Sequence, residues 1–71
     1  MSIAPTASNL LDLRRLPAVR RQTGQSIATI YRSIKAGTFP RPVKIGPRAS
    51  AWVGAEIDQW IANRIADRDA S

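Results

Sequence analysis

Two glycines and two prolines bracket a short helical run in the stretch GQSIATIYRSIKAGTFPRP, residues 24–42. Ser26 is a favourable helix N-cap, because its hydroxyl can accept hydrogen bonds from the free N–H groups of the first turn. Gly37 suits a C-terminal cap, and the prolines after it cannot continue a helix. Between these signals, apolar residues recur at helical spacing. The stretch therefore predicts one short helix with a core-facing stripe of Ile27, Ile30, Tyr31 and Ile34.

Another short helix is predicted just before this one, from about residue 17 to residue 23. Pro17 suits a first turn, where its missing N–H is not needed, and Gly24 suits a C-terminal cap. Leu16 and Val19 lie three residues apart and can both face a core. Two short helices separated by about three residues have the proportions of a helix-turn-helix, although any small helical protein uses similar caps.

A small β-hairpin is predicted after the two helices. Residues 43–45 alternate as a short strand does, Gly46 and Pro47 make a turn, and residues 49–53 return as the partner strand. A hairpin in this position is a wing with Arg48 at its tip. An arginine there can enter a minor groove or hold phosphates, and the alternative is a solvent-facing turn residue.

The last predicted element is an amphipathic helix with a structural role. Its apolar residues recur at helical spacing, at Ile57, Trp60, Ile61 and Ile65. The tryptophans of the chain are expected to build the small core together with the other aromatic residues, although tryptophans can also be stacking platforms for single-stranded bases.

Together these elements predict one mainly α domain over residues 13–66, a winged helix-turn-helix of three helices and a small β-hairpin. Residues 1–12 lack apolar periodicity and are expected to form a flexible tail. Residues 67–71 are expected to fray.

Composition argues against several classes of protein. The 71 residues include no cysteine and no histidine, which removes thiolate and imidazole metal ligands and the commonest acid–base and nucleophile arrangements. We therefore expect no enzyme, no metal and no cofactor. No stretch approaches the roughly 20 apolar residues of a membrane span, and the start of the chain lacks the pattern of a secretory signal. The expected location is the cytoplasm, in association with the nucleoid.

Charge is segregated along the chain. Nine of the eleven basic residues precede residue 49, opposed there only by Asp12, whereas two arginines face four acidic residues after it. The net charge of +6 points toward polyanions as partners. The alternative is a solvated surface whose charge only aids solubility.

Several motifs in order resemble one family. RLPAVRRQTG, S-x-x-T-I-Y-R-x-I-K-x-G-x-F-P-x-P, KIGPRA and W-x-x-x-E-I-D-Q-W-I are similar to the AlpA-type phage regulators and the related small excisionases. The resemblance covers about residues 13–66 and implies a winged helix-turn-helix similar to the MerR DNA-binding domain. It also implies a sequence-directed binder of double-stranded DNA, encoded by a prophage or integrative element.

The helix pattern and the resemblance together select the candidate DNA-binding residues. Arg32, with Thr29 and Ala28, is expected to read base edges. The expected phosphate contacts are Arg20, Arg21, Tyr31 and Lys35. The resemblance also places Ser26 and Ile27 on or beside the recognition helix, and Lys44, Arg48 and Ser50 on the wing.

The sequence departs from the family pattern where the recognition helix opens. The position of Gln25 is often leucine in relatives, and that of Ile27 is often basic or polar. Ile27 is expected to fill the core volume that Gln25 vacates. The alternative is that Ile27 faces DNA and touches a thymine methyl group.

The sequence leaves more than one class of function open. The resemblance is compatible with a transcriptional regulator of excision genes and with a recombination directionality factor that assists a tyrosine or serine integrase. A single module of this size is expected to be monomeric or weakly associated in solution, to assemble on tandem sites, and to bend the DNA. An interaction module for an acidic protein surface is the alternative without DNA.

Overall fold

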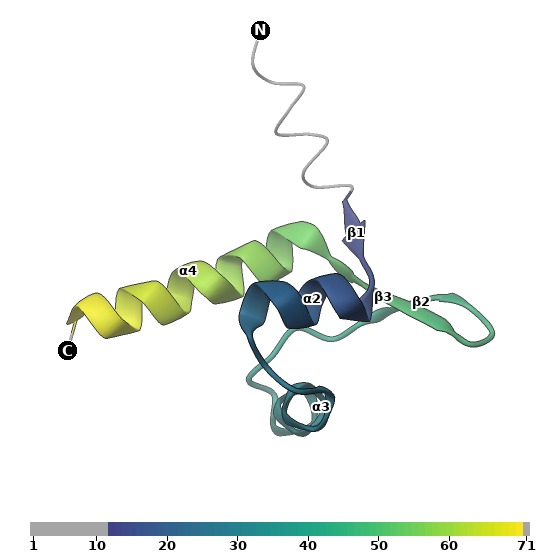
Figure 1. The fold of residues 1–71 in the computed structure, drawn as a ribbon, viewed down its shortest axis with the longest axis horizontal. Coiled ribbons are helices and arrows are strands. Elements are labelled where there is room, and N and C mark those ends of the chain that lie inside the picture. Colours follow the sequence, from purple (N-terminus) through teal and green to yellow (C-terminus); the bar gives the residue numbers. More distant parts are fainter. Residues whose placement is uncertain (1–11, 71) are drawn as a thin grey trace, which may run out of the picture.

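A computed structural model describes residues 12–70 of the chain. It contains three helices and a small antiparallel sheet, which confirms the mainly α winged fold expected from the sequence. In chain order the elements are β1 (Leu13–Arg14), α2 (Leu16–Thr23), α3 (Ile27–Ala36), β2 (Val43–Gly46), β3 (Ala49–Val53) and α4 (Gly54–Ala70), as Figure 1 shows.

The two helices of the helix-turn-helix, α2 and α3, end where the sequence predicts. Gly24 follows α2 with a φ of 73°, and Gly37 follows α3 with a φ of 82°, a left-handed conformation that glycine adopts without strain. The Ser26 hydroxyl accepts a hydrogen bond from the Thr29 amide at 3.2 Å. In Figure 1 α3 is seen nearly end-on while α2 lies lengthwise, so the two helices cross steeply.

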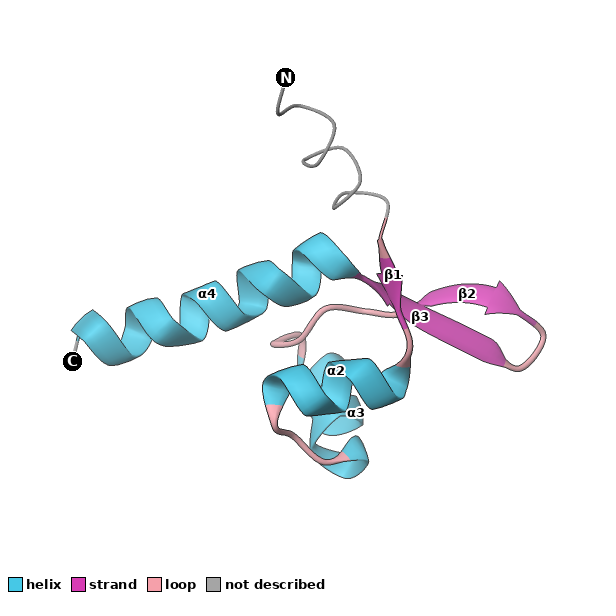
Figure 2. Ribbon diagram, turned by 45° about the horizontal axis from the view of Figure 1, so that its top comes forward, coloured by secondary structure: helices cyan, strands magenta, loops and turns pink. Residues whose placement is uncertain are grey.

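The sheet has the strand order β1-β3-β2, with both pairs antiparallel (Figure 2). The hairpin of β2 and β3 confirms the predicted wing, and a register shift falls between Lys44 and Gly46. Strand β1 was not predicted. It is two residues long, pairing Leu13 with Val53 and Arg14 with Trp52, and two residues are too few to show an alternating pattern.

The core lies where α2, α3, α4 and β3 meet, and it consists of Val19, Ile30, Phe39, Trp52 and Ile57. Leu16, Ile34, Trp60 and Ile61 pack against it and are partly buried. Both indole N–H groups are satisfied by backbone oxygens, that of Trp52 by Pro40 at 3.0 Å and that of Trp60 by Thr38 at 3.1 Å. The core role expected of the tryptophans is therefore confirmed.

Helix α4 extends past the core (Figure 1). Its apolar stripe is buried at Ile57 but 47% exposed at Ile65, because no other described element covers the helix that far along. The helix continues to Ala70. Fraying of its last turn in solution stays a prediction, and residues 1–11 of the expected tail lie outside the described residues.

An ionic cluster around Arg14 joins β1, α2 and α4. The guanidinium donates to the carboxylates of Asp58 and Asp12, each at 2.8 Å at the shortest, and to the amide oxygen of Gln22 at 3.0 Å. Gly54 makes room for it, since a Cβ at that position would lie 2.4 Å from the Asp12 carboxylate and 2.9 Å from Arg14 Nε. The cluster holds the start of α4 against the strand that precedes α2.

Asp58→Asn is expected to lower the free energy of unfolding at pH 7 by about 1 kcal/mol or less, because the Asp58 side chain is 54% exposed to solvent. Hydrogen bonds from Arg14 lower the pKa of the Asp58 carboxyl. A carboxyl of this kind stabilises the fold above its unfolded pKa of about 3.9, and the contribution is lost as the pH falls through its lower folded pKa. Urea unfolding of both proteins at neutral and strongly acidic pH should show the difference shrinking in acid. A difference independent of pH would contradict an ionic contribution.

Candidate nucleic-acid interface

Helix α3 presents one exposed face formed by Ile27, Ala28, Tyr31, Arg32 and Lys35. Each of these residues has another of the set three or four positions away, so they neighbour one another on the helix surface. Ile30 and Ile34, on the adjoining side of α3, pack into the core. The helix is therefore anchored by one face and leaves the other for a ligand.

The first turn of α3 uses two of the predicted site residues for its own cap. The Ser26 hydroxyl donates to Thr29 Oγ1 at 3.0 Å while it accepts from the Thr29 amide. Thr29 is half-buried, in contrast to its exposed neighbour Ala28. The structure thus places Ser26 and Thr29 at the edge of the exposed face, with both hydroxyls already hydrogen-bonded.

Ile27 does not lie in the core, and this expectation was wrong. Its side chain is 45% exposed, whereas Gln25 is half-buried and directs its amide inward. The Gln25 Oε1 atom is buried and has no hydrogen-bond partner among residues 12–70. The residue before the N-cap faces inward here and the first helical residue faces outward, so the backbone direction at the turn decided which of the two is covered.

Gln25→Leu is expected to raise the free energy of unfolding by about 1 to 2 kcal/mol, because it removes a buried acceptor without a partner and adds apolar contact. For a domain of this size that corresponds to a thermal midpoint about 4 to 8 °C higher per kcal/mol. Gln59→Leu on the exposed side of α4 is the matched control and should change stability little. Thermal unfolding followed by circular dichroism measures both. An unchanged or lower midpoint for Gln25→Leu would show that the amide is satisfied in solution.

Tyr31 is also 45% exposed, although the sequence assigned it to the apolar stripe as well as to the phosphate contacts. Its ring meets that of Trp52 edge-on, with centroids 6.3 Å apart. One edge of the ring therefore touches the core while the rest of the side chain stands on the exposed face. This arrangement fixes the ring and keeps it accessible.

Two arginines of α2 border the turn that leads into α3. Arg20 and Arg21 are exposed and line a hollow of about 590 Å³ together with Pro17, Gly24, Gln25 and Ser26. The hollow opens beside the N-terminus of α3, where free backbone N–H groups and the helix dipole favour negative charge. Both arginines thus stand next to the exposed face of α3.

The wing carries further basic residues. Lys44 and Arg48 are exposed, and Lys44 lies directly opposite the half-buried Ser50 across the hairpin. Arg48 lies in the turn between β2 and β3, as predicted. Arg41, which the sequence analysis left out of the candidate site, is also exposed, in the segment between α3 and the wing. The signal that could have found it was its position between two prolines in an extended linker next to two basic elements.

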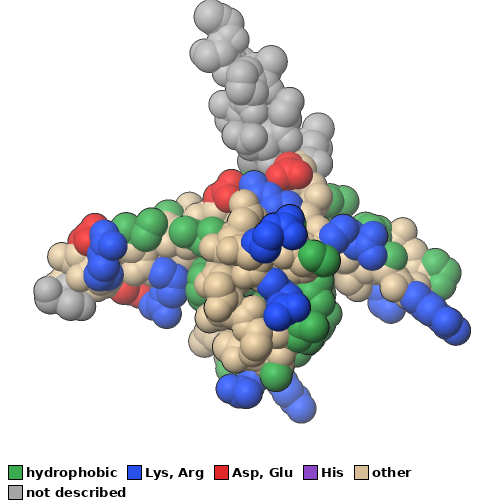
Figure 3. Space-filling view, viewed as in Figure 1, with side chains coloured by type: hydrophobic (Ala, Val, Ile, Leu, Met, Phe, Trp, Pro, Cys, Tyr) green, Lys and Arg blue, Asp and Glu red, His purple; other side chains and the backbone are tan. Residues whose placement is uncertain are grey.

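These charges are free for a ligand. Among residues 12–70, no ion pair involves Arg20, Arg21, Arg32, Lys35, Arg41, Lys44 or Arg48. Figure 3 shows basic side chains over α2, at α3 and along the hairpin on one face of the molecule. Arg14 differs, because its charge is neutralised by Asp12 and Asp58. The cationic surface therefore consists of the helix-turn-helix and the wing.

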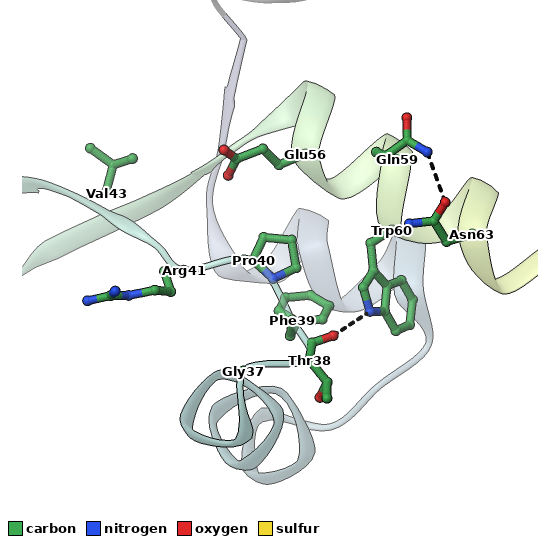
Figure 4. A pocket seen from close by; sticks show the side chains of 10 residues that line it. All are labelled: Gly37, Thr38, Phe39, Pro40, Arg41, Val43, Glu56, Gln59, Trp60 and Asn63. Atoms are coloured by element: carbon green, nitrogen blue, oxygen red, sulfur yellow. Dashed lines mark hydrogen bonds between the residues drawn. The ribbon is translucent and has the colours of Figure 1, made fainter.

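A second hollow, of about 630 Å³, lies between α4 and the segment that follows α3 (Figure 4). Phe39 and Trp60 form its floor, with ring centroids 5.1 Å apart, and polar side chains of α4 form one rim. Glu56 is the only acidic residue in its lining, which suits apolar packing better than acid–base chemistry.

Two features that other protein classes need were not found in the part of the chain that the structure describes. Residues 12–70 contain no group of three or more acidic residues that could hold a metal ion. None of the helices described is long and apolar enough to cross a membrane.

Comparison with known proteins agrees with the resemblance seen in the sequence. Residues 12–65 match the model of the family described as Prophage CP4-57 regulatory protein (AlpA). The DNA-binding transcriptional activator AlpA of Escherichia coli K12 is 39% identical over 56 residues, covering 70% of this chain and 80% of that protein. The protein ORF88 of enterobacteria phage P4 is 43% identical over 54 residues, covering 76% of this chain but only 61% of that protein. No solved structure matches the chain. With its family model matched along most of the described residues, the chain belongs to the AlpA family of prophage regulatory proteins.

Proposed function

We propose that this protein is a sequence-directed binder of double-stranded DNA that regulates a prophage or integrative element. The observation that carries the proposal is the exposed face of α3, on a helix anchored to the core through Ile30 and Ile34, with unpaired basic residues of α2 and the wing nearby. A helix with this exposure fits the major groove, and the basic residues on both sides suit the phosphates that border the groove.

The roles follow from position on that surface. Arg32 is exposed on this face and is the residue proposed to read a guanine edge, with Ala28 one turn before it. Arg20, Arg21, Tyr31 and Lys35 are proposed to contact phosphates and to fix the register of the helix. Lys44, Arg48 and Ser50 are proposed to engage the backbone or the adjacent groove. Thr29, held in the cap by Ser26, is proposed to support the helix end and to contribute to base contacts only from its edge.

Relatives support a regulatory role. The Escherichia coli relative is named a DNA-binding transcriptional activator, and the family model is that of a prophage regulatory protein. Within this role, we propose that the protein either controls the transcription of excision genes or acts directly as a recombination directionality factor with an integrase. Both roles need the same DNA-binding surface. Because the chain spans only 61% of its phage P4 relative, activities of that whole protein are not carried over to it.

Association on DNA is part of the proposal. A single module of this kind buries roughly 600–1,000 Å² on DNA, which limits the affinity and the length of site that one copy can select. We therefore propose a monomer or weak oligomer in solution that occupies tandem sites cooperatively and bends the DNA. Sedimentation that shows a stable dimer at micromolar concentration without DNA would contradict this.

Selection of binding sites from a random pool of duplex DNA at about 0.15 M salt tests the proposal, because weak electrostatic binding is suppressed there. Enrichment of a short motif at regular spacing would support loading on tandem sites, and a single or palindromic site would support a promoter-bound regulator.

The salt dependence is a second expected outcome. If about six phosphates are contacted, log K should fall with log salt at a slope of about −5, which titrations at several salt concentrations measure.

Absence of any enriched motif in the site selection would overturn sequence-directed binding and favour the alternative of an acidic protein partner.

A further inference from the structure

The exposed face of α3 carries an apolar side chain where a surface helix would ordinarily be polar. Ile27 is the first residue of α3 and is 45% exposed, and Ala28 beside it is exposed as well. We infer that Ile27 is a specificity-determining residue that contacts the C5-methyl group of a thymine in the major groove. This inference rests on the proposed function and adds which base the start of the recognition helix selects.

Ile27 does not contribute to the core. The core cluster excludes it, and Gln25, two residues earlier, turns inward although its buried carbonyl oxygen finds no partner among residues 12–70. Stability would favour the opposite assignment, with the apolar residue inside and the amide outside. The exposed isoleucine therefore adds nothing to the core and is available to a ligand at the start of the helix.

The chemistry of the major groove leaves one partner of the right kind. Base edges there present hydrogen-bond donors and acceptors, which an isoleucine side chain cannot satisfy, and the thymine methyl group, which it can cover. Recognition helices place their N-terminal residues against base edges, and Ile27 occupies that end of α3. An isoleucine side chain has no hydrogen-bonding group and no charge, so it does not bind a phosphate either.

The test replaces each thymine of the selected site in turn by deoxyuridine, which keeps every hydrogen-bonding group and lacks only the methyl group. We expect one thymine position at which the replacement weakens binding of the unmodified protein by about fourfold, the value for one buried methyl group. Ile27→Ala should bind the thymine site more weakly and no longer distinguish uracil from thymine there. Ile27→Ala is expected to fold normally, because the side chain lies outside the core, and its circular dichroism spectrum checks this.

Lys35→Ala is the matched control. Lys35 lies on the same face of α3, so its loss should weaken binding while the fourfold preference for thymine remains. No loss at any uracil position, or a loss that persists in Ile27→Ala, would overturn the inference, and the second result would assign the methyl contact to another side chain. Failure of the unmodified protein to select any DNA site would overturn the proposed function together with this inference, whereas selection without a uracil effect would overturn the inference alone.

Discussion

Trp52→Ala is expected to remove most or all of the stability of the fold. Trp52 is 1% exposed and lies at the centre of the core, and its indole N–H is bonded to the Pro40 oxygen. Truncation of a buried tryptophan costs about 3–5 kcal/mol, and a 71-residue chain has a total stability of only about 4–10 kcal/mol. The measurement is urea unfolding followed by circular dichroism at 25 °C.

Ile65→Ala is the matched control for the tryptophan variant. It also removes a large apolar side chain, but from a position on α4 that is 47% exposed. It should change the free energy of unfolding by no more than about 0.5 kcal/mol. If both variants lose the same stability, or if Trp52→Ala unfolds like the unmodified protein, the core described above is not the one that stabilises the domain.

The second large effect concerns binding. Arg32→Ala is expected to weaken binding to the selected DNA site by about 5- to 150-fold, which corresponds to the 1–3 kcal/mol typical of a bidentate contact with guanine. It should also relax specificity at that base pair, because the interaction that rejects other bases is gone. Arg32 has no ion-pair partner within the described chain, so stability should hardly change. Titrations against the site and its single-base variants measure both effects.

Arg20→Ala separates base reading from phosphate contact. Arg20 lies on α2 beside the turn rather than on the exposed face of α3, so its loss should weaken all sequences about equally and reduce the salt slope by about one. The assignment of Arg32 would be refuted by a specificity profile that the Arg32 variant leaves unchanged.

Much of the fold could be read from local signals in the sequence. Both helix C-caps are glycines with positive φ, the Ser26 cap binds the amide of Thr29 three residues later, and the hairpin is set by a turn between two short strands. Each of these features depends on residues within a few positions of one another, so local chemistry suffices to predict it. The basic character of the helix-turn-helix and the wing was likewise visible as a count along the chain.

Contacts between distant residues had to come from the tertiary structure. The sequence counts Arg14 only among the nine basic residues before residue 49, yet its charge is neutralised by Asp12 and by Asp58, the latter 44 residues away. Strand β1 exists only because β3 offers it a partner, since its two residues carry no pattern of their own.

The start of α3 shows the same division most clearly. Helical periodicity places Ile27 and Tyr31 on one stripe with Ile30 and Ile34. A small domain has few elements to cover a helix, so only part of such a stripe is buried. Which part is covered depends on where α2 and β3 lie against α3, and that packing leaves Ile27 and Tyr31 outside. The sequence by itself determined the helices, the turn and the wing, because short-range caps and turns specify them. Only the tertiary structure decided which side chains remain on the surface that meets a ligand, because exposure is a property of the neighbours that fold against a residue.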